Sequence, residues 1–146
     1  GLPPLPGGIA VEGAGTGGST PAAVGWLHEC PIVVYWGDLD AAGLTILHQH
    51  REAGLDVISI LMDIPTYDTY AEFGTNLDAK GNPIKIAPRK PLPTLNDAER
   101  ALYERLTDPA WRGYRRVEQE RIPLDHASAA LCGMVNALGE NDGSDQ

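Results

Sequence analysis

The sequence predicts an α/β domain in which helices flank a parallel sheet. Two apolar, β-rich segments, at 31–36 and 56–62, are separated by a segment at 41–53 whose apolar residues have helical spacing. The second strand segment is apolar almost throughout, which is typical of strands buried on both faces. Strands that alternate with helices at these lengths pair in parallel through right-handed crossovers. The 146 residues suit one domain of this class, spanning 1–146.

The N-terminal part of the domain is expected to add a strand, a turn and a helix. Residues 9–11 (Ile-Ala-Val) predict a short buried strand, and 13–18 predict a glycine-rich turn. Pro21 follows Thr20, a good helix N-cap, so we expect a helix from Pro21 to Glu29.

Regular periodicity is lost after Asp63, where prolines become frequent. We expect a short helix at 66–73 and then an irregular, proline-rich insertion at 74–93. Within this insertion, the alternation at 84–86 predicts a short strand.

The last part of the chain is predicted to be helical. Asn96 and Glu99 have the spacing of a capping box, so a helix should start directly after Asn96. Pro123 opens the final helix, and Gly139 is expected to end it. The polar residues 139–146 would then form a disordered tail.

Charge and composition exclude several classes of function. The formal net charge of −9 argues against a general nucleic-acid-binding surface, but not against a nuclease, because bound divalent cations offset clustered carboxylates. No apolar run approaches the length of a membrane span, so no membrane partner is expected. Cys30 and Cys132 lack zinc-site spacing and are expected to be buried thiols of a cytoplasmic protein. The basic residues concentrate late in the chain and are either solvated surface or phosphate contacts: Lys85, Arg89, Lys90, Arg112, Arg115, Arg116 and Arg121.

Asp38 and Asp40 are the strongest candidates for chemistry. They follow the strand segment 31–36 one residue apart, so on an extended backbone both side chains point the same way. Paired carboxylates suit Mg²⁺ or Mn²⁺, and open α/β sheets hold their sites at the carboxyl ends of strands. In the alternative interpretation, Asp40 only caps the helix that starts near Ala41, because a D-x-D pattern alone is weakly specific.

The glycine at position 43 narrows the choice among proteins with D-x-D after an apolar strand. Toprim domains, the metal-binding fold of topoisomerases and primases, have D-x-D-x-x-G, the pattern that Asp38, Asp40 and Gly43 form here. Haloacid-dehalogenase-like phosphatases would use Asp38 as nucleophile and Asp40 as acid, but they have Thr or Val where this chain has Ala42. Sugar-nucleotide transferases have no fixed glycine at this position.

Glu118 and Glu120 form a second acidic motif, E-Q-E, between arginines. Runs of this kind are most often solvated salt-bridge faces. The two side chains share a side on an extended segment but diverge by about 200° on a helix. We therefore expect one glutamate to approach Asp38 and Asp40 or to pair with a nearby arginine, and the other to face solvent or a partner subunit.

Three segments together, at 35–43, 61–63 and 117–123, resemble the C-terminal Toprim-type domain of the JetD family, also called MksG or EptD. Members of this family are the nuclease subunits of Wadjet anti-plasmid systems, and the resemblance extends from about Gly8 to Leu138. It implies a metal-dependent endonuclease that cuts double-stranded plasmid DNA together with a condensin-like SMC–kleisin complex. It also implies a homodimer in the full-length protein.

The resemblance implies roles for individual acidic residues. Asp38 and Asp40 match the Toprim aspartate pair and would hold the Mg²⁺ or Mn²⁺ ion. Glu118 and Glu120 match the late E-Q-E motif of the family and are counted as catalytic together with the aspartates.

A complete Toprim fold also carries a glutamate on its first strand. The segment at 9–11 matches the second, glycine-ended strand better, so we expect this glutamate upstream of residue 1. The domain would then be truncated on its N-terminal side and inactive by itself. Alternatively, Glu12 is that glutamate, and we count it with Gly43 and Asp63 as a near-site residue. A third interpretation is a non-catalytic Toprim interaction module.

Overall fold

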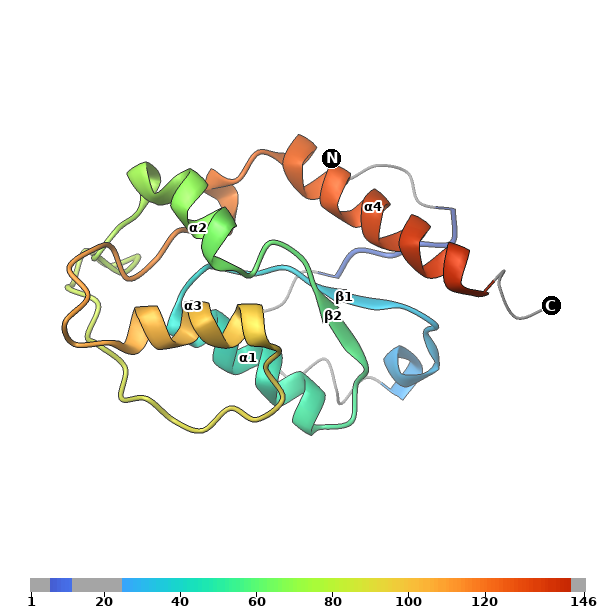
Figure 1. Cartoon of the computed structure of the whole chain (residues 1–146), viewed down its shortest axis with the longest axis horizontal. Helices are drawn as coiled ribbons and strands as arrows, with labels where there is room; N and C mark the ends of the chain where they lie inside the picture. Colours follow the sequence, from blue (N-terminus) through green and yellow to red (C-terminus); the bar gives the residue numbers. More distant parts are fainter. Residues whose placement is uncertain (1–5, 12–24, 143–146) are drawn as a thin grey trace.

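The chain forms helices around a small central sheet (Figure 1). The computed structural model describes residues 6–11 and 25–142. In chain order its elements are the 3₁₀ helix η3 (Gly25–Glu29), β1 (Val33–Tyr35), α1 (Ala41–Glu52), β2 (Val57–Ser59), α2 (Ile64–Tyr70), η4 (Ala71–Phe73), α3 (Asp97–Thr107), η5 (Gln119–Arg121) and α4 (Leu124–Asp142).

The sheet consists of β1 and β2, which pair in parallel. Val33 lies opposite Val57 and Tyr35 lies opposite Ser59, and the ladder ends with the Ile60 N–H donating to the Tyr35 carbonyl at 3.0 Å. Helix α1 makes the crossover between the two strands. The predicted α/β class, with parallel strands flanked by helices, is confirmed.

Helices flank the two strands. Helix α1 packs against β2 and α3, and α3 also contacts α2. In Figure 1, α4 runs along the other side of the strands from α1 and α3. Among the helices of the described part, none is long and apolar enough to cross a membrane.

The core lies mainly between α1, α3 and the segments that follow the strands. Leu44 and Leu47 of α1 and Leu102 of α3 are completely buried. Leu39 and Val117, outside the regular elements, are equally inaccessible. Since burying one such side chain stabilises a fold by roughly 1.5–3 kcal/mol, these residues hold both acidic motifs firmly against the core.

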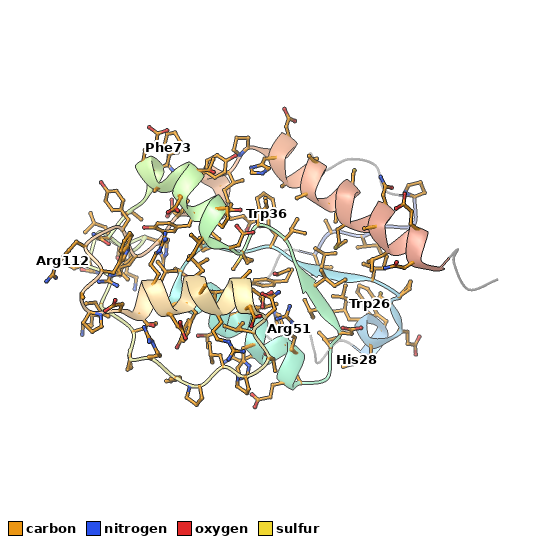
Figure 2. All side chains as sticks on the ribbon, in the orientation of Figure 1. Trp26, His28, Trp36, Arg51, Phe73 and Arg112 are labelled. Carbon is orange, nitrogen blue, oxygen red and sulfur yellow. The ribbon has the colours of Figure 1, made fainter. Side chains whose placement is uncertain are left out.

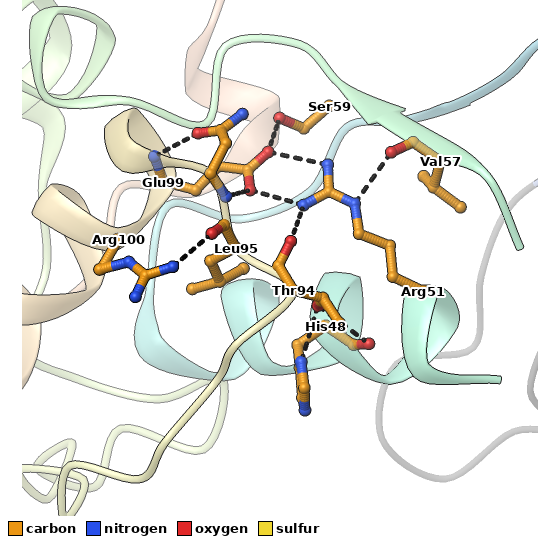
Figure 3. Close-up of polar contacts among 9 residues, drawn as sticks. His48, Arg51, Val57, Ser59, Thr94, Leu95, Glu99 and Arg100 are labelled. Carbon is orange, nitrogen blue, oxygen red and sulfur yellow. Dashed lines mark hydrogen bonds and ion pairs between the residues drawn. The ribbon is translucent and has the colours of Figure 1, made fainter. Parts of the chain in front are cut away.

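An arginine–glutamate network ties the end of α1 to the start of α3 (Figure 3). The Arg51 guanidinium donates to both Glu99 oxygens, at 2.6 and 3.0 Å, and to the carbonyls of Val57 and Thr94. Glu99 is 1% exposed and also accepts from the Ser59 hydroxyl. A buried carboxylate needs such complete pairing, because an unpaired charge in the interior is strongly destabilising.

The helix starts follow the sequence signals closely. Asn96 and Glu99 form the predicted capping box at the start of α3. The predicted short helix at 66–73 starts slightly earlier, as α2, because Asp63 caps it by accepting from the Thr66 N–H at 2.9 Å. Helix α4 continues past Gly139 to Asp142, so the predicted end at Gly139 is wrong. A helical glycine with open space around it costs stability but does not force an end.

Two strand predictions are wrong. Residues 9–11 form no strand, and Ile9 and Val11 are largely exposed, because no neighbouring strand in the described part pairs with them. Residues 84–86 are irregular as well, and the segment between η4 and α3 contains only isolated bridges, among them Leu77 opposite Pro83. The predicted turn at 13–18 lies outside the described residues.

The other elements are shorter than predicted. Strand β2 stops at Ser59 because the backbone turns soon afterwards, with Leu61 at a φ of 57°. Of the helix predicted from Pro21 to Glu29, only the part from Gly25 onward is described, and it is a 3₁₀ helix. Figure 2 shows Trp26 and His28 of this helix at one end of the molecule, with Phe73 and Arg112 at the other.

Candidate functional site

The two acidic motifs are far apart in the sequence but meet across an antiparallel bridge. The Leu39 N–H donates to the Val117 carbonyl at 2.9 Å, and the Val117 N–H donates to the Leu39 carbonyl at 3.2 Å. Both side chains are completely buried. Because side chains alternate along an extended backbone, Asp38 and Asp40 leave the bridge on the side opposite to Leu39.

Asp40 has both carboxylate oxygens engaged. It is the N-cap of α1, and its Oδ1 accepts the Gly43 N–H at 2.6 Å. Its Oδ2 accepts a hydrogen bond from Arg116 Nε at 2.7 Å. The capping role that the sequence left as an alternative is therefore observed, together with an ion pair that the sequence did not indicate.

Asp38 is half-buried and less fully satisfied. Its Oδ1 accepts the backbone N–H of Gln119 at 2.8 Å, and no donor among the described residues reaches its Oδ2. Burial raises the pKa of Asp38, and the charges of Asp40 and Glu120 raise it further, against the opposing effects of the Gln119 N–H and Arg116. Asp38 thus carries a carboxylate whose negative charge the protein compensates only in part.

The D-x-D-x-x-G pattern needs a glycine at position 43 for steric reasons. A Cβ at Gly43 would overlap the carbonyl oxygen of Asp38, so a larger residue would push α1 away from the aspartates. The Gly43 carbonyl accepts the Tyr35 hydroxyl at 3.1 Å, and a Cβ at Gly37 would collide with that hydroxyl. Burial, and then the charges of Asp40 and Asp38, raise the pKa of Tyr35, which keeps its hydroxyl protonated and donating.

The E-Q-E motif lies at the edge of the same cluster. Glu118 is half-buried before η5, and its Oε2 is 3.8 Å from Arg121 Nε. Glu120 is exposed, and its charge is among those that raise the pKa of Asp38. This agrees with the expectation that one glutamate pairs with an arginine and the other faces solvent.

Of the two other residues predicted to lie near the site, Asp63 and Glu12, the structure describes only Asp63. Asp63 follows β2 at the same edge of the sheet as Asp38, where it caps α2. No group of three or more His, Cys, Asp or Glu in the described part is arranged to hold a metal ion. Glu12 lies outside the described residues.

The chemistry of the donor set still fits Mg²⁺ or Mn²⁺. In proteins, Mg²⁺ usually keeps several waters and is bound through one or two carboxylates plus substrate phosphates, not by a complete protein cage. Asp38 offers an oxygen that no described donor engages, and Asp40 offers a second one if Arg116 moves aside.

Comparison with known families identifies the group to which this arrangement belongs. A family model described as "Wadjet protein JetD, C-terminal" matches residues 1–131, a range that includes both acidic motifs. The chain belongs to this family. A search among curated proteins found no match. Membership connects this JetD C-terminal domain to Wadjet plasmid defence and suggests a nuclease-related role.

Sequence reasoning missed two groups that this JetD C-terminal domain places in the cluster. Arg116 is expected from the sequence at the surface, at phosphates or beside Glu118 and Glu120, but not at Asp40, and the Gln119 backbone N–H leaves no trace in side-chain patterns. The alternation of polar and apolar residues in Arg116–Val117–Glu118 was an available signal. With Val117 buried, Arg116 and Glu118 had to share the other face.

Proposed function

We propose that this domain is a metal-dependent DNA endonuclease domain that cleaves plasmid DNA. The observation that carries the proposal is the bridge between Leu39 and Val117, which joins the D-x-D segment to the E-Q-E segment. It gathers carboxylates from both motifs on the side of the bridge that faces away from the core. Such clusters hold the cations that phosphoryl-transfer enzymes use.

Asp38 and Asp40 would hold the Mg²⁺ or Mn²⁺ ion. When bound, such an ion polarises the scissile phosphate and stabilises the leaving oxygen. The protein itself fixes the two ligands: the Gln119 N–H orients Asp38, and the Gly43 N–H at the start of α1 orients Asp40. Both carboxylates are thus already oriented when a cation and a phosphate arrive, although Arg116 still occupies Asp40 Oδ2.

The E-Q-E glutamates would act at the rim of this centre. Glu120 is exposed and electrostatically coupled to Asp38, so it is available to orient a water molecule next to the metal. Glu118, paired with Arg121, would hold the segment in register.

Productive DNA binding requires further elements. The chain has a formal net charge of −9 and repels a phosphate backbone unless a basic partner surface is present. We propose that the condensin-like SMC–kleisin complex and a second JetD subunit provide that surface in the cytoplasm. The glutamate that the resemblance to Toprim domains implies would complete the ligand set.

The proposal is tested by removing one carboxylate charge at the site and one elsewhere. In the intact protein with its SMC partner, Asp38→Asn should abolish plasmid cleavage and the saturable binding of Mn²⁺. Asp56→Asn is the matched control, because Asp56 is exposed and precedes β2 at the other end of the strand. If the Asp38→Asn variant cleaved plasmid DNA as well as the active Asp56→Asn control, the proposed endonuclease site would be refuted.

Two other functions would give different results in the same experiment. A phosphorylated Asp38 that forms on incubation with a phosphate ester would point to phosphatase chemistry. Cleavage that depends on the partner complex but not on Asp38 or Asp40 would leave this domain as an interaction module.

A further inference from the structure

We propose that Arg116 is an internal counter-cation of this site, which pairs with Asp40 and competes with the divalent cation for it. This inference rests on the proposed function, since it assigns a regulator to the same carboxylates. Arg116 Nε lies 2.7 Å from Asp40 Oδ2, and the two side chains are only 21% and 7% exposed. The guanidinium therefore places a positive charge directly on the oxygen of Asp40 that a metal ion would use.

The backbone fixes Arg116 at this place. The Arg116 N–H donates to the Thr75 carbonyl, the Thr75 N–H donates to the Arg116 carbonyl, and the next residue, Val117, is bridged to Leu39. Two consecutive bridges therefore fix the backbone of Arg116 next to the site. Its position does not depend on the rotamer of a long, freely rotating side chain.

The other carboxylates of the cluster also interact electrostatically with the Arg116 guanidinium. Burial alone would lower the pKa of Arg116, but the hydrogen bond to Asp40 and the charges of Asp40, Asp38 and Glu118 raise it. The positive charge thus takes the electrostatic role that a divalent cation would take. A guanidinium and a cation bound to the same carboxylate would repel each other, so each weakens the binding of the other.

Arg116 is held loosely enough to leave. Nε makes its one hydrogen bond to a side chain among the described residues, whereas the Arg51 guanidinium makes four hydrogen bonds to Glu99, Val57 and Thr94. Arg51 is locked into the fold, and Arg116 can swing toward solvent by breaking one contact.

The experiment measures Mn²⁺ affinity in the intact protein by calorimetric titration. Arg116→Gln should tighten the Mn²⁺ dissociation constant by about tenfold, the scale of one charge-assisted hydrogen bond. Arg116→Lys, which keeps the charge but loses the planar donor, should tighten it less, and it serves as the test if the glutamine variant does not fold. Arg105→Gln is the control, because Arg105 forms an ion pair of similar length, 2.6 Å, with Asp68 of α2, and its loss should leave the Mn²⁺ affinity unchanged.

A second readout separates competition from a structural role. In EDTA, Arg116→Gln should melt at a lower temperature than the wild type, and saturating Mn²⁺ should raise its melting temperature by more. Unchanged or weaker Mn²⁺ binding by the Arg116 variants, with a wild-type site that Asp38→Asn removes, would overturn the competition alone. Absence of any saturable site in the wild type and in Arg116→Gln would overturn the metal site together with it.

Discussion

Two arginine–carboxylate pairs, one near each end of α1, differ in how completely they are satisfied. Near the end of the helix, Arg51 binds both oxygens of Glu99, which is 1% exposed. At the start of the helix, Arg116 makes a single hydrogen bond to Asp40, next to the half-buried Asp38. The same helix therefore connects a fully paired network with an acidic cluster that is short of positive charge.

The pKa shifts express this difference. Burial alone would raise the pKa of Glu99, but hydrogen bonds from Arg51, Ser59 and the Asn96 N–H outweigh it, and the pKa is lowered. At Asp38, burial prevails and the pKa is raised. The first pair contributes to stability, whereas the second region keeps a charge that folding disfavours. Functional sites often retain such groups at a cost in stability.

Breaking the Arg51–Glu99 network should have the largest effect. Arg51→Met leaves Glu99 as a buried, unpaired carboxylate, so the free energy of unfolding should fall by about 3–5 kcal/mol. Urea denaturation measures the loss, and the double variant Arg51→Met with Glu99→Met should recover part of it. A loss as small as that caused by a typical exposed ion pair would show that the network does not hold α1 to α3.

Gly43→Ala should have an intermediate effect at the other end of α1. The added Cβ meets the Asp38 carbonyl, and overpacking of this kind costs about 1–3 kcal/mol. Gly133→Ala is the matched control, because a Cβ there meets open space in α4, and this helical substitution should be neutral or stabilising. Equal stabilities of the two variants in thermal melts would contradict the steric explanation of the D-x-D-x-x-G pattern.

Asp38→Asn should have the smallest effect on stability, with the opposite sign. The folded pKa of Asp38 is above the unfolded value, so its ionised form opposes folding at neutral pH. The variant should gain less than about 1 kcal/mol at pH 7, because Asp38 is partly solvated. The gain should vanish as the pH falls to the ordinary range of an aspartate.

Glu99→Gln provides the comparison for this pH dependence. The lowered folded pKa of Glu99 stabilises the protein above the unfolded value, and this contribution is lost as the pH falls through the folded pKa. Glu99→Gln should therefore destabilise the protein at pH 7 and flatten its acid unfolding curve. If the stabilities of the Asp38 and Glu99 variants changed with pH in the same way, the opposite pKa shifts of the two carboxylates would be contradicted.

The sequence predicted those parts of the molecule that depend on local chemistry. The crossover between the strands and the capping box at Asn96 and Glu99 follow from periodicity and hydrogen-bonding capacity over a few residues. The predicted strand at 9–11 fails because a strand needs a partner, which local pattern does not supply. The partners of the acidic residues, Arg116 and the Gln119 N–H, come from a long-range bridge. These partners reach the acidic residues only because Leu39 packs against the core and pairs with Val117, a contact that local sequence patterns do not reveal.

The most direct test of the account is a paramagnetic NMR titration of ¹⁵N-labelled protein with Mn²⁺. If the two motifs form one metal site, substoichiometric Mn²⁺ should broaden the amide signals of Asp38–Gly43 and of Val117–Gln119 together, and Asp38→Asn should remove both effects. Broadening that spreads over the acidic surface, or that persists in Asp38→Asn, would contradict a shared metal site.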